Sequence, residues 1–140
     1  MKKHYLDTTF DDEFLMFGVV SNERPHRIAW ILNENLGYNF ERKDDIHFLN
    51  KDQQESFFSR FEFIDDLNRL QYHLLGNNDE GQRLLPELKN VDYLLIIKGA
   101  IDYVDPKGFL GKVKSLESIQ LITELDPNVL KSKQNLIIPD

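Results

Sequence analysis

The segment of residues 91–97 limits the fold of this chain more than any other feature. Alternate side chains on one of its faces are apolar, and Leu94 and Ile96 make most of the opposite face apolar as well. A strand with one exposed face alternates apolar with polar residues, whereas a strand covered on both faces is almost continuously apolar. The segment therefore predicts a central strand with other parts of the chain packed against both faces.

Two other segments have the apolar spacing of an amphipathic helix. In residues 25–36, apolar side chains recur at intervals near the helical period, Pro25 suits the first turn, and Gly37 suits the stop. Asp105 and Pro106 suit the start of a second helix. The apolar stripe of this second helix consists of Phe109, Val113 and Leu116.

The other regular segments alternate between apolar and polar residues, as half-exposed strands do. One alternation begins at Tyr38, is interrupted by a predicted turn at residues 43–45, and resumes at Ile46. Residues 65–66 and 76–78 suit further turns. The predicted strands are residues 14–20, 38–48, 57–63, 70–74, 91–97 and 119–125.

The order strand, helix, four strands, helix, strand predicts an α+β protein. We expect a two-layer sandwich, with a mixed, mostly antiparallel sheet of about six strands and two helices on one face, formed by a single domain over residues 1–140. If residues 91–97 and 119–125 share a sheet, the helix between them makes these strands parallel and their connection right-handed. Residues 136–138 suit an added edge strand.

Composition narrows the classes of function. The formal charge of −7 opposes general binding to nucleic acid, because affinity for phosphates comes from Lys and Arg. The absence of cysteine excludes disulfides, a Cys-based zinc site and a thiol nucleophile, and it fits a reducing compartment. The first residues carry too many charges for a signal peptide, and no apolar run approaches the roughly 20 residues that span a bilayer. We therefore expect a cytoplasmic protein that binds neither nucleic acid nor membrane.

No spacing of metal-binding or catalytic residues stands out. The four histidines are scattered, and His73 falls on the polar side of an alternating strand, where we expect it to be solvated. Motifs of nucleotide-binding loops, serine nucleophiles and zinc proteases are absent from the sequence. The sequence therefore predicts no catalytic residue, no metal ligand and no cofactor.

Residues 85–93 read LPELKNVDY and resemble the signature of the bacterial IPExxxVDY family, whose small proteins have an uncharacterised function. Leu85 stands where the family has Ile, and the matching positions are Pro86, Glu87, Val91, Asp92 and Tyr93. The segments RIAWILNENLG and LDPNVLKSKQNLI are similar to the family too, so the resemblance extends over the chain. It implies no activity, substrate or catalytic residue.

The first part of this motif predicts a restricted loop. Pro86 disfavours a helical conformation at Leu85 and has no N–H to donate to a sheet, so both residues are expected in a loop or at a sheet margin. Val91 begins the apolar central strand. We therefore expect structural roles for Leu85, Pro86 and Val91.

Asp92 is the unusual residue of the central strand, because it lies on an apolar face. A buried carboxylate needs hydrogen bonds. In a structural interpretation, which we favour, Asp92 accepts from loop N–H groups or pairs with an arginine, and Glu87 fixes the loop similarly. In a functional interpretation, Glu87 and Asp92 anchor a ligand in a small pocket and Tyr93 forms its aromatic wall. A second Asp-Tyr pair, Asp102-Tyr103, would line the same rim.

The leading hypothesis is a non-enzymatic cytoplasmic protein-interaction or regulatory module. It would form a homodimer through a sheet edge or helix face, or bind another protein, and Phe58 is expected to contribute exposed apolar surface. The alternative is a small-ligand-binding sensor domain with a pocket near Glu87, Asp92 and Tyr93. An enzyme that uses those carboxylates is the third hypothesis. The sequence identifies neither the ligand nor the protein partner.

Overall fold

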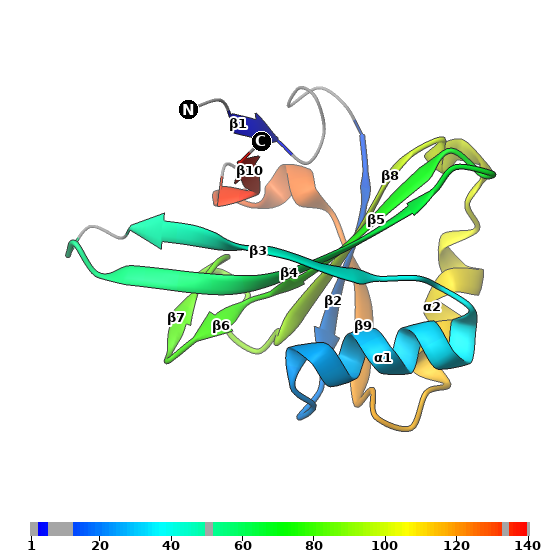
Figure 1. Cartoon of the computed structure of the whole chain (residues 1–140), viewed down its shortest axis with the longest axis horizontal. Coiled ribbons are helices and arrows are strands. Elements are labelled where there is room, and N and C mark those ends of the chain that lie inside the picture. Colours follow the sequence, from blue (N-terminus) through cyan, green and yellow to red (C-terminus); the bar gives the residue numbers. More distant parts are fainter. Residues whose placement is uncertain (1–2, 6–12, 50–51, 133–134, 140) are drawn as a thin grey trace.

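A six-stranded antiparallel sheet is the frame of the structure (Figure 1). This computed structural model describes residues 3–5, 13–49, 52–132 and 135–139. The strand order in the main sheet is β3-β4-β5-β8-β2-β9. The bounds of its strands are β2 (Leu15–Val20), β3 (Glu41–Leu49), β4 (Glu55–Asp65), β5 (Leu70–Gly76), β8 (Tyr93–Gly99) and β9 (Leu121–Leu125).

Two helices cover one face of this sheet, which confirms the predicted α+β sandwich. Helix α1 (Pro25–Leu36) begins at a proline and stops before Gly37, whose φ of 71° lies in the left-handed region. Helix α2 (Pro106–Lys114) places Phe109 against Phe17 of β2, with the ring centroids 4.9 Å apart. Buried side chains of both helices share one core cluster with side chains of β2, β5 and β8, so the helices lie on the same face.

The opposite face of the sheet is covered by irregular chain. Two short strands, β6 (Asn78–Asp79) and β7 (Gln82–Arg83), follow β5 and lead into the loop of residues 84–92. Leu84 and Leu85 of this loop and Leu136 of the C-terminal segment are buried in a second core cluster with side chains of β8. Strand β8 is therefore covered on both faces, which confirms its prediction as a central strand.

The main sheet is antiparallel throughout, which corrects the prediction of a mixed sheet. Strands β8 and β9 are connected through the 3-10 turn η1 (Ile101–Tyr103) and α2, and they run in the same direction. However, β2 lies between them and pairs antiparallel with both. The predicted crossover is therefore present, but it skips one strand position and creates no parallel pair.

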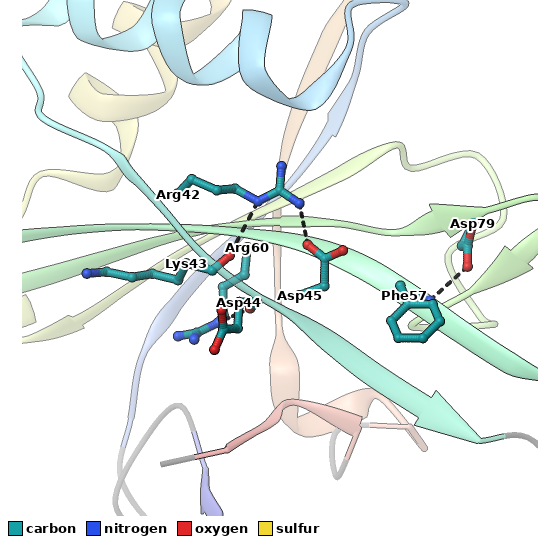
Figure 2. A network of polar contacts seen from close by, with 7 residues as sticks. All are labelled: Arg42, Lys43, Asp44, Asp45, Phe57, Arg60 and Asp79. Atoms are coloured by element: carbon teal, nitrogen blue, oxygen red, sulfur yellow. Dashed lines mark hydrogen bonds and ion pairs between the residues drawn. The ribbon is translucent and has the colours of Figure 1, made fainter.

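Edge strand β3 contains a β-bulge where the sequence suggested a turn (Figure 2). The pairing of β3 with β4 shifts by one residue between Lys43 and Ile46 and then continues to Leu49. Across this bulge Arg60 Nε donates to the carbonyl of Asp44 at 2.9 Å. The residues involved are drawn in Figure 2. The predicted turn at residues 43–45 is wrong, because the extra residue is absorbed within a continuous strand.

The C-terminal segment forms a strand, but it does not extend the main sheet. Strand β10 (Ile137–Pro139) pairs antiparallel with β1 (Lys3–Tyr5) in a separate two-stranded sheet (Figure 1). The 3-10 turn η2 (Pro127–Val129) lies between β9 and this strand along the chain. The prediction of an added edge strand at residues 136–138 is therefore corrected: Leu136 is buried in the second core, and the strand has a partner of its own.

Phe58 and His73 are buried although we expected them to be exposed. Phe58 has an exposed fraction of 0% within the second core, and its neighbour Phe57 has one of 50%. His73 has an exposed fraction of 3%. Alternation along a strand assigns side chains to two faces, but it does not show that irregular chain covers the more polar face.

Candidate functional site

Asn77 organises the loop of residues 84–92 from within the core. Its buried side chain donates from Nδ2 to the carbonyls of Leu88 and Val91, each at 2.9 Å. Its Oδ1 accepts from the N–H of Leu85 at 2.8 Å. One amide therefore holds the loop near both of its ends.

Asn77 was not identified from the sequence, which indicated a turn at residues 76–78. The only local signal is a polar residue directly after a strand. Its three loop contacts come from residues 8 to 14 positions further along the chain. Local propensity therefore could not reveal this role.

Asp92 and Tyr93 hold the connection between β2 and α1. The Asp92 carboxylate accepts from the N–H of Ser21 at 3.0 Å, as the structural interpretation expected, and the Asp92 N–H donates to the carbonyl of Val19 at 2.8 Å. The Tyr93 hydroxyl donates to the carbonyl of Glu23. Burial, together with the negative charges of Asp92 and Glu23, raises the pKa of Tyr93 to about 12. The hydroxyl therefore stays protonated at neutral pH and remains a hydrogen-bond donor.

A pocket of about 360 Å³ lies beside these two residues. The β2–α1 connection, the end of β5 and the start of β8 contribute residues to its lining. Its charged lining residues are Glu23, Arg24 and Asp92. Asp92 and Tyr93 both line the pocket, but each already bonds the backbone of the β2–α1 connection.

Glu87 is not among the residues that line this pocket. Its carboxylate accepts from the N–H of Ser132 at 2.8 Å and from the Ser132 hydroxyl. Partial burial opposes ionisation, but hydrogen bonds from Ser132 and from the backbone hold the pKa of Glu87 below its ordinary value. The structure therefore brings Asp92 and Tyr93 together and uses Glu87 elsewhere, to fasten the C-terminal segment to the loop.

The three remaining motif residues occupy positions that suit structural roles. Leu85 is fully buried in the second core, and Pro86 lies exposed in the loop. Val91 packs on the backbone of β2 at Gly18, where an added Cβ would lie 3.0 Å from Val91 Cγ2. The motif therefore joins the central strand to β2, to the β2–α1 connection and to the C-terminal segment.

A second pocket, of about 380 Å³, lies at the other end of β8. The turn between β4 and β5 and the residues after β8 line it, and Leu67 and Tyr103 border it with exposed fractions of 91% and 92%. Because β8 begins at Tyr93 and ends at Gly99, Tyr103 lies beyond the end opposite to Tyr93. The Asp102-Tyr103 pair therefore does not line the rim of the first pocket.

The backbone beneath this second pocket is tightly packed. The N–H of Ala100 donates to the carbonyl of Arg69 at 3.0 Å. Gly99 has a φ of 108°, and an added Cβ there would lie 2.3 Å from the same carbonyl oxygen. The β4–β5 turn and the end of β8 are therefore fixed to one another, and they present Leu67 and Tyr103 on a defined backbone.

His73 is a buried ionisable group outside both pockets. Within the described part of the chain, neither ring nitrogen has a hydrogen-bond partner, and Glu62 Oε2 lies 3.8 Å from Nδ1. Burial, together with the positive charges of Lys98 and Arg60, lowers the pKa of His73 to about 3. This desolvation outweighs the attraction of the Glu62 carboxylate, so the ring is neutral at physiological pH.

The described ranges contain no group of three or more His, Cys, Asp or Glu side chains that could hold a metal ion. Among the helices in those ranges, none has both the length and the apolar character needed to cross a membrane. A search against protein-family models finds no match for the chain, and a search among curated proteins finds no match either. Membership of the IPExxxVDY family therefore stays a prediction that rests on residues 85–93 and on the segments RIAWILNENLG and LDPNVLKSKQNLI.

Proposed function

We propose that this chain is a non-enzymatic protein-interaction module that binds its partner at the surface around Leu67 and Tyr103. The observation that carries the proposal is the exposure of these two large side chains, which both line one pocket. Exposed apolar patches in soluble proteins mark interaction sites, because their burial against a partner is favourable. Tyrosine is also enriched among the residues that dominate binding free energies.

The fixed backbone beneath this surface supports the same proposal. Binding is weakened when a loop must be ordered, and preorganised surfaces avoid that cost. Here the hydrogen bond from Ala100 to Arg69 and the close packing of Gly99 fix both segments before any partner arrives. The binding free energy from contacts of Leu67 and Tyr103 is therefore not reduced by a cost of ordering the turn.

The charges of the two segments favour a basic partner. The β4–β5 turn contains Asp66 and Arg69, and η1 contains Asp102. Two further acidic side chains flank these segments, Asp65 at the end of β4 and Asp105 before α2. Opposite charges accelerate association and are screened by salt. We infer a partner segment with basic residues around one apolar side chain, which inserts into the pocket.

The proposal includes a cytoplasmic location and membership of the IPExxxVDY family. The cysteine-free composition supports the location, and the five matching motif positions support the family. An enzymatic role for the motif has less support. Asp92 and Tyr93 bond the β2–α1 connection, and Glu87 bonds Ser132.

Capture from a lysate of the source cells, with the double variant Leu67→Ser/Tyr103→Ser, tests the proposal. We expect the amount of partner captured by the variant to be lower than that captured by the unaltered chain by a factor of about ten or more. The reason is that each hot-spot residue contributes about 2 kcal/mol or more to the binding free energy. The matched control is Val129→Ser, which alters a side chain of 74% exposure on η2. Because all three side chains are exposed, neither variant should change the melting temperature by more than a few degrees.

Equal retention by the double variant and the control would overturn this assignment. Retention should also fall as salt is raised, because the surface is acidic. A partner that binds equally well at low and high salt would contradict the inferred basic chemistry.

Small-ligand binding is a second candidate, favoured by the first pocket. Its volume of about 360 Å³ falls within the range of ligand sites, and two of the three residues named by that hypothesis, Asp92 and Tyr93, line it. A thermal-shift screen of polar metabolites should then find a compound that raises the melting temperature of the unaltered chain but not of Arg24→Ala. If no compound does so, or if the shift persists in the variant, this candidate is rejected.

A further inference from the structure

The two edge strands of the main sheet differ in their capacity to pair with another chain. In β3, residues 41–45 are all charged and the bulge interrupts the pairing register. Charges and bulges on an edge strand hinder the addition of a further strand. In β9, Glu124 is the single charged residue, and the pairing with β2 is unbroken. Strand β9 is therefore the less protected edge.

No strand pairs with the outer side of β9 in the part of the chain that the structure describes. Thr123 is exposed, and Leu121 has an exposed fraction of 53%. Helix α2 packs on the face of the sheet, where Phe109 and Val113 join the first core. Strand β9 is thus a five-residue strand at the edge of the main sheet, visible beside β2 in Figure 1.

The direction of the free backbone groups follows from the pairing with β2. The carbonyl of Val20 on β2 points towards β9, because it accepts from the N–H of Gln120, which precedes β9, at 2.9 Å. Leu121 lies directly opposite Val20, so its backbone groups face β2 in turn. Backbone groups of a strand point alternately to its two sides. Those of Ile122 and Glu124 therefore point to the open side.

We propose that β9 pairs antiparallel with β9 of a second copy of this chain, with Thr123 opposite Thr123 of the second copy. In this register Ile122 lies opposite Glu124 of the second copy, so the outward backbone groups of both residues find partners. Cross-strand Thr–Thr pairs are favourable, and the exposed Leu121 gains Leu125 of the second copy as an apolar neighbour. This pairing relates the two copies by a two-fold axis and joins their two six-stranded sheets into one continuous sheet.

The neighbouring registers are less favourable. Centring the pair on Glu124 would bring two like charges face to face, which destabilises a pair of strands. Centring it on Ile122 would place Glu124 opposite Gln120 of the second copy, whose N–H is already donated to Val20. The register centred on Thr123 avoids both costs.

Cysteine cross-linking tests the register, because the chain contains no cysteine of its own. In the proposed dimer the Thr123 Cα atoms of the two copies lie about 4.5 Å apart, within the range of a disulfide. The two Leu121 Cα atoms are offset by about four residues along the strands, roughly 14 Å, which is too far. Under mild oxidation we expect Thr123→Cys to form a disulfide dimer at least about tenfold faster than Leu121→Cys.

Sedimentation equilibrium tests the association itself. A five-residue strand pair buries little surface, so we expect a weak dimer that is populated at about 0.1 mM protein. Leu121→Lys should remain monomeric, because an edge lysine opposes strand addition. Val129→Lys, an exposed position outside β9, should dimerise like the unaltered chain.

The proposal is overturned if the unaltered chain is monomeric at that concentration, or if Leu121→Lys dimerises equally well. It is also overturned if the two cysteine variants cross-link at the same rate. Its failure is distinguishable from failure of the proposed function, because Leu67→Ser/Tyr103→Ser alters the other surface and should leave the dimer intact.

Discussion

The Asn77 side chain makes three hydrogen bonds within the core, and the loop of residues 84–92 depends on them. Asn77→Ala would leave the N–H of Leu85 and the carbonyls of Leu88 and Val91 without this partner. The carbonyl of Leu88 keeps the N–H of Val91 as a donor. The other two groups lose their partner at a cost of about 1 kcal/mol or more each, so we expect the free energy of unfolding to fall by about 2 kcal/mol. Equilibrium urea unfolding measures the change.

The control for this prediction is Asn39→Ala, which alters an exposed asparagine. It should change the free energy of unfolding by less than about 0.5 kcal/mol. If the two variants were equally stable, the Asn77 amide would not hold the loop as described.

His73 should make the protein sensitive to acid. Its pKa is about 3 in the folded state and about 6.5 in the unfolded chain, so the unfolded chain takes up this proton first. Above pH 6.5 the ring is neutral in both states and contributes no pH dependence. As the pH falls from 6.5 towards 3, His73 should lower the free energy of unfolding by up to about 1.4 kcal/mol per pH unit.

His73→Leu removes this contribution, and its stability at pH 7 should equal or exceed that of the unaltered chain, because two unpartnered nitrogens are removed. Urea unfolding of both proteins at several pH values isolates the effect of His73, since the carboxylates are common to both. Parallel pH profiles for the two proteins would show that His73 is not buried in its neutral form.

The sequence predicted residue positions better than residue surroundings. The structural interpretation of Asp92 expected hydrogen bonds from a loop, and the Ser21 N–H supplies one. The predicted exposure of Phe58 and His73 was wrong, because the alternation of apolar and polar residues along a strand does not show what covers each face of the sheet. Nothing in the local sequence distinguishes the buried Asn77 from the exposed Asn78 beside it.

At the scale of elements, the junction between the β4–β5 turn and the end of β8 depends on Gly99. Gly99→Ala would place a Cβ 2.3 Å from the Arg69 carbonyl oxygen, at a φ of 108° that side chains rarely adopt. We expect the free energy of unfolding to fall by about 2 kcal/mol or more, because backbone on both sides would have to shift. Urea unfolding measures the loss.

Gly111→Ala is the matched control, because Gly111 lies inside α2 and an added Cβ would have no neighbour within 4 Å. Replacing a helical glycine by alanine should raise the free energy of unfolding by up to about 1 kcal/mol. The changes in the free energy of unfolding are therefore expected to have opposite signs for the two variants. A neutral Gly99→Ala would contradict the close packing at this junction.

Both helices and all six main strands were predicted, because apolar periods identify them and prolines mark the helix starts. The strand ends were less accurate: the strands predicted to begin at residues 38 and 91 begin at Glu41 and Tyr93. Hairpin β6–β7 was not, since its two-residue strands are too short to show a period. The bulge in β3 resembled a turn because residues 43–45 are all charged. The sheet order was not predicted either, because local sequence does not show that β2 inserts between β8 and β9.

At the scale of the whole molecule, we propose different roles for the two ends of β8. At its start, the motif residues Asp92 and Tyr93 bond the connection that leads into α1. Beyond its other end, Leu67 and Tyr103 are exposed on a fixed backbone. The sequence motif identified the first end as a candidate site. The surface that we propose for partner binding could not be predicted from the sequence, because it is formed by two segments that are distant along the chain, the β4–β5 turn and η1.

Quantitative capture with two variants in parallel tests this division of roles most directly. Asp92→Ala removes the acceptor for the Ser21 N–H and should lower the melting temperature, yet below that temperature it should retain as much partner as the unaltered chain. Leu67→Ser/Tyr103→Ser should keep the melting temperature and lose the partner. If instead Asp92→Ala loses the partner while it is folded and the double variant keeps it, the interaction site lies at the motif, and the proposed roles of the two ends of β8 are wrong.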